Sequence, residues 1–334
     1  MNLFKNLFST GTKNPKANPT KGKNRAQLSL ESLEERAVPA TFGFESGSTL
    51  YVFGDDSVNK VEIKDNGTNA PGNIRYRLDS RFSYEDDRSP WTQTRGNISY
   101  IRVMTYGGDD IVRYRLTNSL RSSGRQTLNV SAGDGNDIVW GEVRGNLSSY
   151  SWFNMYAYGG NGNDQLAAFG FGDLSYGSYL NTSLYGQQGN DAIYGLMDND
   201  VDVSYNATVS MNLYGDQGYD YFEARYDGEL DGRVLLNLRG GDQNDTARVR
   251  FFMDTGSSGT VGDRYRSALV AGDSGNDYLD FQIWKADRGF AGAEPDSSIN
   301  AQIQGNTGFD RFTLTPNVSR TGQLDRGEVV TIRR

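Results

Sequence analysis

The amino-acid sequence predicts an all-β fold, a right-handed parallel β-solenoid with about 27 residues per coil, and three observations lead to this prediction. One aspartate recurs at nearly constant spacing from residue 110 to residue 310, a glycine-rich turn precedes it, and apolar and polar residues alternate on both sides. The content of 41 Gly, 20 Tyr and 16 Phe is typical of turn-rich β structure, because disordered chains contain few aromatic residues. We expect the solenoid to occupy residues 41–334, with the clearest repeats at 98–315, after a separate segment at 1–40.

One aspartate per coil defines the repeat. The first three steps between these aspartates are 27 residues each, and the later steps are 29, 25, 32 and 33 residues. Asp56 lies two 27-residue steps before the first of them, which leaves room for one weak coil in between. The aspartates are Asp110, Asp137, Asp164, Asp191, Asp220, Asp245, Asp277 and Asp310.

Apolar residues keep fixed positions around each aspartate. The positions nine and seven residues before it and two residues after it are apolar in every coil, except at Thr182. The residues between them are mostly polar, for example Asn129 and Asn212. This period of two indicates strands with one buried face. Each coil is therefore expected to run strand, tight loop, strand and then a return of about ten residues.

A single coil of this kind exposes an apolar face, and stacking buries that face against the neighbouring coils. A parallel solenoid achieves this, and crossovers between parallel strands are right-handed by default. Residues 201–213 alternate throughout, so a return can itself be a strand. The sequence leaves a two-sheet roll and a three-sheet helix both open, and an antiparallel sandwich remains an alternative.

The chain contains no Cys and no His, which excludes several kinds of chemistry. Disulfide frameworks, thiolate metal sites and Ser-His-Asp or Cys-His catalysis are ruled out. The oxygen ligands that remain suit hard cations, chiefly Ca²⁺. A net charge of −8 argues against a broad nucleic-acid interface. No apolar run has the length of a transmembrane helix, so we expect no transmembrane segment.

The turn before each aspartate is rich in glycine and asparagine. Both residues tolerate the positive φ angles of tight loops, and glycine lets main-chain carbonyls turn towards a cation. A degenerate first copy is Tyr106-Gly-Gly-Asp-Asp110. The clearest copies are Ala132-Gly-Asp-Gly-Asn-Asp137, Gly159-Gly-Asn-Gly-Asn-Asp164 and Gly186-Gln-Gln-Gly-Asn-Asp191.

Residues 106–312 resemble the hemolysin-type calcium-binding (RTX) repeat, G-G-x-G-x-D-x-U-x, where U is a large apolar residue. In that family the aspartate and the carbonyls of the glycine-rich turn bind Ca²⁺ between stacked turns. This chain differs because it carries one motif per coil rather than tandem copies. Gln243 also replaces a motif glycine, and Tyr219 and Phe309 stand where other copies have Asn. The resemblance implies Ca²⁺ ligands at Asp110, Gly133, Asp134, Gly135, Asp137, Gly160, Gly162, Asp164, Gly189, Asp191, Asp216, Asp220, Asp242, Asp245, Asp273, Asp277 and Asp310.

Electrostatics favours a cation over bare turns. Stacked carboxylates about 5 Å apart repel by roughly 1 kcal/mol in bulk water and by about 3 kcal/mol at an effective dielectric near 20. Calcium removes this repulsion. The alternative is that the repeats are only Gly/Asx turns, in which each aspartate bonds to main-chain groups without a metal.

Residues 1–40 are predicted to be a disordered basic segment, since Lys, Asn, Pro and Gly dominate it. Residues 28–40, Leu-Ser-Leu-Glu-Ser-Leu-Glu-Glu-Arg-Ala-Val-Pro-Ala, resemble the LE-x-LE-x-R-x-x-P segment that opens many large extracellular proteins of planctomycetes. The resemblance implies export, and hence an extracellular or cell-surface location.

These observations favour a secreted, calcium-binding structural protein of a surface or matrix, with cell-surface polysaccharide or other surface proteins as partners. One alternative is a calcium-independent adhesin, for which Tyr150, Tyr176 and Tyr179 could form an aromatic ladder for carbohydrate. The other is a β-helix polysaccharide lyase or glycosidase that works through carboxylates and Arg, with Glu223, Arg225 and Asp280 as candidates. We expect no enzymatic activity, since nothing in the sequence unites these three residues.

Overall fold

The computed structural model describes residues 41–79, 90–198, 200–254, 266–286, 294–295, 300–314 and 329–332. Within these ranges all regular elements are β-strands and no helix is present, so the all-β class is confirmed. The predictions for residues 1–40 lie outside the described residues.

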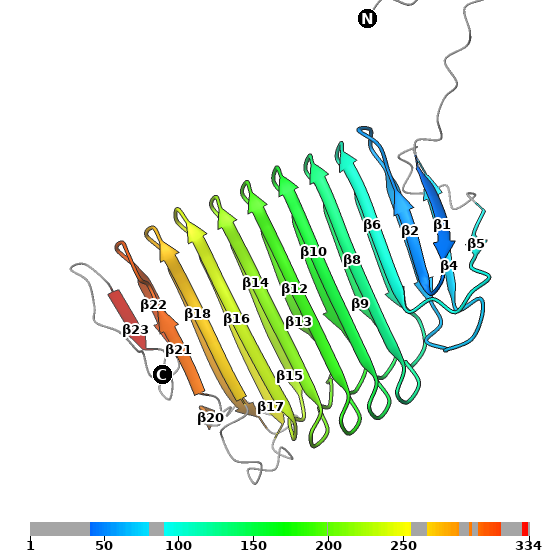
Figure 1. The fold of residues 1–334 in the computed structure, drawn as a ribbon. Helices are drawn as coiled ribbons and strands as arrows, with labels where there is room; N and C mark the ends of the chain where they lie inside the picture. Colours follow the sequence, from blue (N-terminus) through cyan, green and yellow to red (C-terminus); the bar gives the residue numbers. More distant parts are fainter. Residues whose placement is uncertain are drawn as a thin grey trace, which may run out of the picture. The chain divides into compact units, whose positions relative to one another are not determined.

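The strands form two sheets on either side of one core, and from β6 to β19 the chain alternates between the sheets from one strand to the next (Figure 1). In spatial order the described part of the first sheet consists of β1 (Phe42–Ser46), β2 (Thr49–Phe53), β6 (Tyr100–Gly107), β8 (Arg125–Asp134), β10 (Trp152–Asn161), β12 (Tyr179–Gln188), β14 (Thr208–Gln217), β16 (Arg233–Asp242), β18 (Arg266–Ser274) and β21 (Asn300–Gln304). The described part of the second sheet consists of β5 (Thr92–Gln93), β4 (Ile74–Asp79), β3 (Lys60–Asp65), β7 (Ile111–Leu116), β9 (Ile138–Val143), β11 (Gln165–Gly170), β13 (Ala192–Met197), β15 (Tyr221–Gly228), β17 (Thr246–Asp254), β19 (Tyr278–Ala286), β22 (Arg311–Leu314) and β23 (Val329–Ile332), with β20 (Glu294–Pro295) beside β19.

Neighbouring strands are parallel through most of both sheets. Trp152 on β10 pairs with Arg125 on β8 and with Tyr179 on β12, so equivalent residues are 27 apart in these coils. Tyr179 in turn pairs with Thr208 on β14, and Thr208 with Arg233 on β16. These offsets reproduce the spacing of the repeated aspartates. The parallel pairing excludes the antiparallel sandwich, and the two long sheets are compatible with a β-solenoid.

The first coil stacks directly on the coil of Asp110, whereas the sequence had suggested one weak coil between them. Leu50 on β2 pairs directly with Ile101 on β6, and Val61 on β3 pairs directly with Val112 on β7. The weak coil expected between Asp56 and the first repeat is therefore absent from the described residues. Residues 74–79 and 92–93 instead form β4 and β5, which extend the edge of the second sheet in antiparallel fashion.

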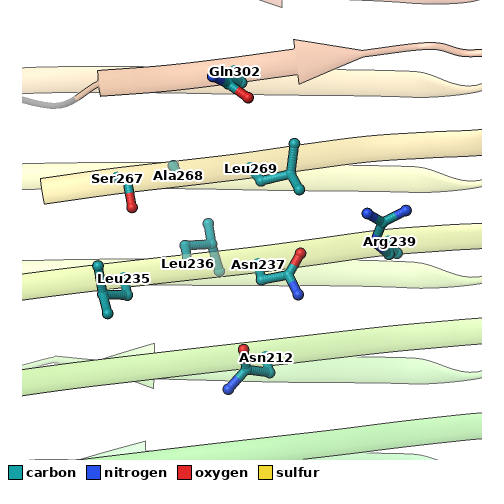
Figure 2. Close-up of a pocket in the computed structure, with 9 residues that line it drawn as sticks. All are labelled: Asn212, Leu235, Leu236, Asn237, Arg239, Ser267, Ala268, Leu269 and Gln302. Carbon is teal, nitrogen blue, oxygen red and sulfur yellow. The ribbon is translucent and has the colours of Figure 1, made fainter.

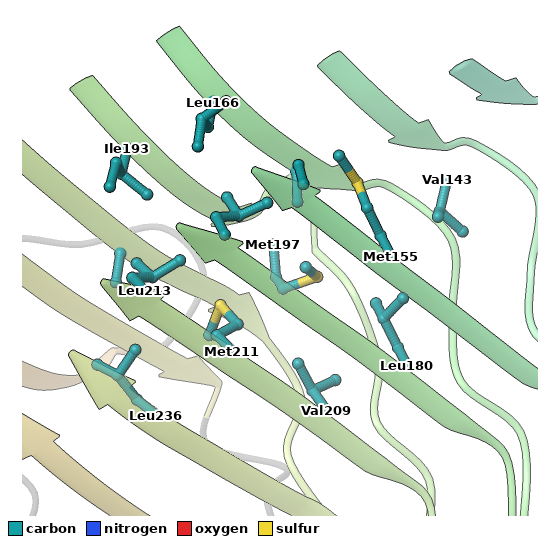
Figure 3. Close-up of a cluster of buried hydrophobic side chains, with 14 of the residues drawn as sticks. Val143, Met155, Leu166, Leu180, Ile193, Met197, Val209, Met211, Leu213 and Leu236 are labelled. Atoms are coloured by element: carbon teal, nitrogen blue, oxygen red, sulfur yellow. The ribbon is translucent and has the colours of Figure 1, made fainter. Parts of the chain in front are cut away.

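The predicted inward positions form the core. Every residue nine or seven positions before a repeated aspartate, or two positions after it, is at most 5% exposed. Figure 3 shows Met155, Met211 and Leu213 among these buried side chains. Thr182, the polar exception, is also buried, and its hydroxyl donates to the carbonyl of Ser210 at 3.5 Å. One apolar face per strand therefore holds the two sheets together.

The returns add a narrow third row to the two sheets. One buried residue per coil pairs with its equivalent in the next coil through an isolated parallel bridge. The five residues of this row are Leu120, Leu147, Leu174, Val203 and Leu230. The architecture is thus a two-sheet roll with one apolar corner, rather than a helix with three full sheets.

Candidate cation site in the stacked turns

The glycine-rich turns lead from each long strand of the first sheet into the following strand of the second sheet. They stack above one another at the strand ends, at the top of Figure 1. This placement brings the predicted site residues of successive coils next to each other.

Close approach between coils explains the glycines in the middle of the turns. Gly133, Gly135, Gly160, Gly162 and Gly189 have φ angles of 121°, 138°, 124°, 135° and 132°. A Cβ atom added to Gly160 would lie 1.9 Å from the carbonyl oxygen of Gly133, and one added to Gly162 would lie 1.9 Å from that of Gly135. A side chain at these positions would therefore meet the main chain of the preceding coil.

The repeated aspartates form a continuous hydrogen-bonded ladder. All eight are buried, with exposures of 3% or less. In each coil Oδ1 accepts a hydrogen bond from the main-chain N–H of the aspartate in the preceding coil, at N···O distances of 2.7–2.8 Å. At the N-terminal end the amide of Asn59 donates to Asp110 in the same way, at 2.7 Å. The sites at Asp220 and Asp310, where the motif departs most, belong to the same ladder.

A second ladder, which the sequence reasoning missed, runs in the opposite direction. The Oδ1 atoms of Asn136, Asn163 and Asn190 accept hydrogen bonds from the next coil, at 2.7–2.9 Å. The Asn that precedes most of the repeated aspartates was the sequence pattern from which this ladder could have been predicted. The main-chain amides of Tyr219 and Phe309 donate the last hydrogen bond of their row. Their side chains carry no amide or carboxylate oxygen that could accept the next one.

The interruption of the asparagine ladder at Tyr219 is accompanied by a long main-chain hydrogen bond. The amide of Gly218 lies 3.4 Å from the carbonyl oxygen of Asp242, whereas the equivalent bonds from Gly162, Gly189 and Gly275 measure 2.8–2.9 Å. The coils on either side of Tyr219 are therefore joined less tightly than their neighbours.

The second carboxylate oxygen of the ladder has no donor. In six of the aspartates Oδ2 is buried and forms no hydrogen bond with the described residues. Leaving a buried acceptor unpaired costs about 1–3 kcal/mol, and more when the group is charged. The six residues are Asp137, Asp164, Asp191, Asp220, Asp245 and Asp277.

In four coils, those of Asp164, Asp191, Asp220 and Asp245, the Oδ2 atom and a main-chain carbonyl oxygen of the next coil lie beside the Cα atom of the same glycine. A Cβ atom added to Gly159 would lie 2.1 Å from Oδ2 of Asp164 and 2.8 Å from the carbonyl oxygen of Gly186. The same pair recurs around Gly186 and Gly215 in the following coils. A buried carboxylate oxygen that has no hydrogen-bond donor is stabilised when it is protonated or when it binds a cation.

The surroundings raise the pKa values of the ladder. Burial raises the pKa of Asp137 and Asp191 to about 6, and the amide that donates to each carboxylate lowers it in part. The pKa of Asp245 rises to about 8, because burial is reinforced by three neighbouring carboxylates. Burial raises the pKa to about 7 in the remaining cases with a resolved shift, Asp110, Asp164, Asp220 and Asp277.

The other predicted acidic ligands lie outside the buried ladder. Asp134, Asp216 and Asp242 are exposed, and Asp273 is partly exposed. Asp134 accepts a hydrogen bond from Asn161 at 2.6 Å, and Asp273 accepts one from Asn306 at 2.9 Å. Asp216 is close enough to raise the pKa of Asp191. These side chains therefore form an outer acidic row along the turns.

The turns fit a cation through single oxygens rather than through a carboxylate cluster. Among the described residues, no three acidic side chains converge on one point. A cation in a turn would instead bind one buried Oδ2 and the neighbouring glycine carbonyls, which are hard oxygen ligands of the kind that Ca²⁺ accepts.

The predicted aromatic residues of the returns lie together. The rings of Tyr150 and Tyr176 are 5.5 Å apart, and Tyr205 extends the row at 6.1 Å from Tyr176. All three are exposed. Tyr179 lies elsewhere, on β12 of the first sheet, and its ring packs 5.5 Å from that of Trp152. The returns thus carry an exposed aromatic row, although not with the predicted membership.

An open groove of about 450 Å³ lies on the first sheet over β14 to β21. Figure 2 shows Asn212, Asn237 and Gln302 on three of its strands. Asn237 donates to the hydroxyl of Tyr214 at 2.7 Å, while its Oδ1 is buried and accepts no bond from the described residues. The groove has a mixed apolar and polar lining, and Arg239 is its one charged lining residue within the described part of the chain, so it is not a candidate for cation binding.

The three residues considered for catalysis lie on the outer face of the second sheet. Glu223 and Asp280 belong to one row but are separated by Arg248. Arg225 contacts Asp227, with an N···O distance of 2.9 Å. The row is thus a set of neighbouring charges that extends over several strands.

No family model, curated protein or solved structure matches this chain. No helix in the described part of the chain is long and apolar enough to cross a membrane.

Proposed function

We propose that the chain is a secreted calcium-binding structural protein of a cell surface or extracellular matrix. In this proposal it is a right-handed solenoid of about 27 residues per coil, with Ca²⁺ bound between the stacked glycine-rich turns. The observation that carries the proposal is the row of buried aspartate Oδ2 atoms that have no hydrogen-bond donor among the described residues, with main-chain carbonyl oxygens of the stacked turns nearby. The resemblance to the hemolysin-type repeat supports the same cation.

Electrostatics gives the cation its role. Neighbouring ionised aspartates about 5 Å apart repel by about 3 kcal/mol at an effective dielectric near 20. A divalent ion beside each Oδ2 removes this repulsion and pairs the unsatisfied oxygens. At ten times its Kd, each site would add about 1.4 kcal/mol to the free energy of unfolding.

Repetition favours a structural role over catalysis. The acceptor pair recurs from coil to coil, so calcium at these positions would stiffen the stack along its length rather than form one reaction centre. Extracellular calcium modules bind with Kd values of roughly 10⁻⁴–10⁻³ M, which suits the export predicted from residues 28–40.

The test is thermal unfolding of the full chain in EDTA and in 5 mM CaCl₂, together with a triple variant, Asp137→Asn, Asp164→Asn and Asp191→Asn. Asparagine keeps an Oδ1 acceptor for the ladder and supplies an N–H donor for the glycine carbonyl, so the variant should fold in EDTA. We expect calcium to raise the Tm of the wild type by more than 5 °C, since several sites each contribute about 1 kcal/mol. This rise should fall by about half or more in the variant.

The matched control is the pair Asp134→Asn and Asp242→Asn, which removes exposed carboxylates from the same turns. It should retain most of the calcium response. A wild-type Tm that is the same in EDTA and in calcium would overturn the proposal.

A calcium-independent adhesin is the second candidate, and two observations favour it. Every Oδ1 is already satisfied by a main-chain amide, and the raised pKa values would let a proton satisfy Oδ2. The exposed row Tyr150, Tyr176 and Tyr205 would then be the binding surface. Full stability in EDTA, with loss of surface binding in a Tyr150→Ser, Tyr176→Ser variant, would support this alternative.

A further inference from the structure

Three cations lie side by side on the outer face of the second sheet. Lys64 on β3 pairs in register with Arg75 on β4 and with Arg115 on β7. The residues that alternate with them, such as Ile63 and Tyr114, are buried, so the three charged side chains point away from the core.

This row departs from the pattern of the row beside it. There, Glu62 lies between Arg77 and Arg113 and forms an ion pair with Arg77, so the charges alternate in sign. Like charges directly opposite each other on neighbouring strands destabilise a sheet. The row Arg75, Lys64 and Arg115 therefore carries a repulsion that its neighbour avoids.

The carboxylates near the row are already engaged. Glu142 accepts two hydrogen bonds from Arg115, at 2.8 and 3.2 Å, and lies 2.7 Å from Nε of Arg144. Within the described ranges no carboxylate lies within ion-pair distance of Lys64. Its pKa is lowered, by burial first and then by Arg115, Arg75 and Arg77.

An aromatic ring completes the surroundings. Nζ of Lys64 lies 4.4 Å from the centre of the Trp91 ring, and the guanidinium of Arg75 lies 5.6 Å from it. Lys64, Trp91 and Arg115 line one cavity of about 250 Å³, and Lys64 and Arg75 line a second cavity of about 310 Å³. Lys64 therefore lies between two small openings on the surface.

We propose that Arg75, Lys64 and Arg115, with Trp91 beside them, bind the anionic groups of an acidic polysaccharide, which are uronate carboxylates or sulfate esters. An oxyanion at this position would accept charge-assisted hydrogen bonds from Lys64 and Arg75 and relieve the repulsion within the row, while Arg115, which also bonds to Glu142, adds positive charge beside them. The indole ring offers an apolar surface to the sugar that carries the charge. The chain carries a net charge of −8, so attraction to a polyanion depends on local clusters of cations such as this one.

The test is isothermal titration of the full chain with polygalacturonate, dextran sulfate and neutral dextran, in EDTA at 50 and 500 mM NaCl. EDTA prevents calcium from bridging the glycan to the acidic turns, so the outcome does not depend on the calcium proposal. We expect binding of at least one anionic polymer, weakening in high salt, and no binding of dextran. Binding of one anionic polymer alone identifies carboxylate or sulfate as the recognised group.

Lys64→Gln is the variant that tests the proposal. Lys64 pairs across the sheet with two cations, Arg75 and Arg115, so removing its charge breaks no ion pair among the described residues of the fold. The substitution should weaken glycan binding at least about tenfold while leaving Tm unchanged or higher. If Lys64→Gln lowers Tm, the binding of Arg75→Gln is measured in its place. The Arg75 side chain is exposed, so its substitution should leave the fold intact.

Arg102→Gln, which removes an exposed cation from the first sheet, is the matched control and should bind like the wild type. The proposal fails if neither anionic polymer binds. It also fails if the deciding variant binds like the wild type.

Discussion

At the scale of single residues, the two glycines of each turn serve different purposes. Gly162 has a φ of 135°, and the main chain of the preceding coil occupies the space where its Cβ would lie. A Cβ atom on Gly159 would instead meet mainly a side chain, with Oδ2 of Asp164 at 2.1 Å and the carbonyl oxygen of Gly186 at 2.8 Å. In the preceding turn Ala132 occupies the position equivalent to Gly159 and is fully buried. The fold therefore already accepts a methyl group at one position but not at the other.

Paired alanine substitutions test this difference. Gly162→Ala should lower the free energy of unfolding by about 2–4 kcal/mol, because it combines backbone strain with a clash between coils. Gly159→Ala should cost less than about 1 kcal/mol, as the Ala132 precedent indicates. Urea denaturation in EDTA provides the measurement. Equal losses for the two variants would show that the glycines are equivalent.

The sequence predicted which residues occupy the turns but not how they bond. The spacing of the aspartates placed Asp137 and Asp164 in equivalent positions, and the structure stacks them as neighbours. The donor to each Oδ1 comes from another coil, so no local pattern reveals it. The row of Arg75, Lys64 and Arg115 could not be predicted for the same reason. Lys64 and Arg115 are 51 residues apart in the sequence, and only the pairing of their strands brings them side by side.

At the scale of elements, the asparagine ladder is the feature that can be extended. The side-chain oxygen of Asn190 accepts a hydrogen bond from the amide of Tyr219, and the row ends there because Tyr219 has no equivalent oxygen. The following coil resumes with Asn244, which accepts from the amide of Asn276. A missing bond between two otherwise regular coils is thus a local defect.

Tyr219→Asn should repair this defect. The new side chain would accept a hydrogen bond from the amide of Asn244 and raise the free energy of unfolding by about 0.5–1 kcal/mol. The opposite change, Asn163→Ala, should remove one bond of the ladder and cost a similar amount. Thermal unfolding of both variants in EDTA checks the pair. A lower Tm for Tyr219→Asn would contradict the assigned role of the ladder.

The strands were predictable because each keeps a period of two over its whole length. The elements that escaped prediction lack this regularity. β4 and β5 belong to an irregular, charged part of the sequence, and they add to the sheet edge instead of forming a further coil. Each return contributes one residue to the parallel bridges, such as Leu147, which is too sparse a pattern to show that the returns form a narrow row rather than a third sheet.

At the scale of the whole molecule, the aspartate ladder links stability to pH. The folded pKa values of about 6–8 lie above the ordinary value of 3.8. Between these values the folded chain binds more protons than the unfolded chain, so the free energy of unfolding decreases as pH rises. This loss of stability is complete above about pH 8, where the aspartates of the ladder are ionised in both the folded and the unfolded chain.

In EDTA we therefore expect Tm to fall steadily as pH is raised from 5 to 8. Calcium should oppose this fall, since it compensates the same carboxylates that lose their protons. Melting curves at half-unit pH steps, with and without 5 mM CaCl₂, measure both effects. A Tm in EDTA that rises between pH 5 and 8 would mean that the ladder is not destabilised by its charge.

The weak junction at Tyr219 has a mechanical consequence. Tension along the stacking direction acts on every junction in series, so the first to separate is the one with the poorest bonds. Between β14 and β16 a main-chain bond is stretched to 3.4 Å and the asparagine row is broken. We therefore expect the turns at this junction to separate more easily under force than those of the junctions between β8 and β14, where both bonds are kept.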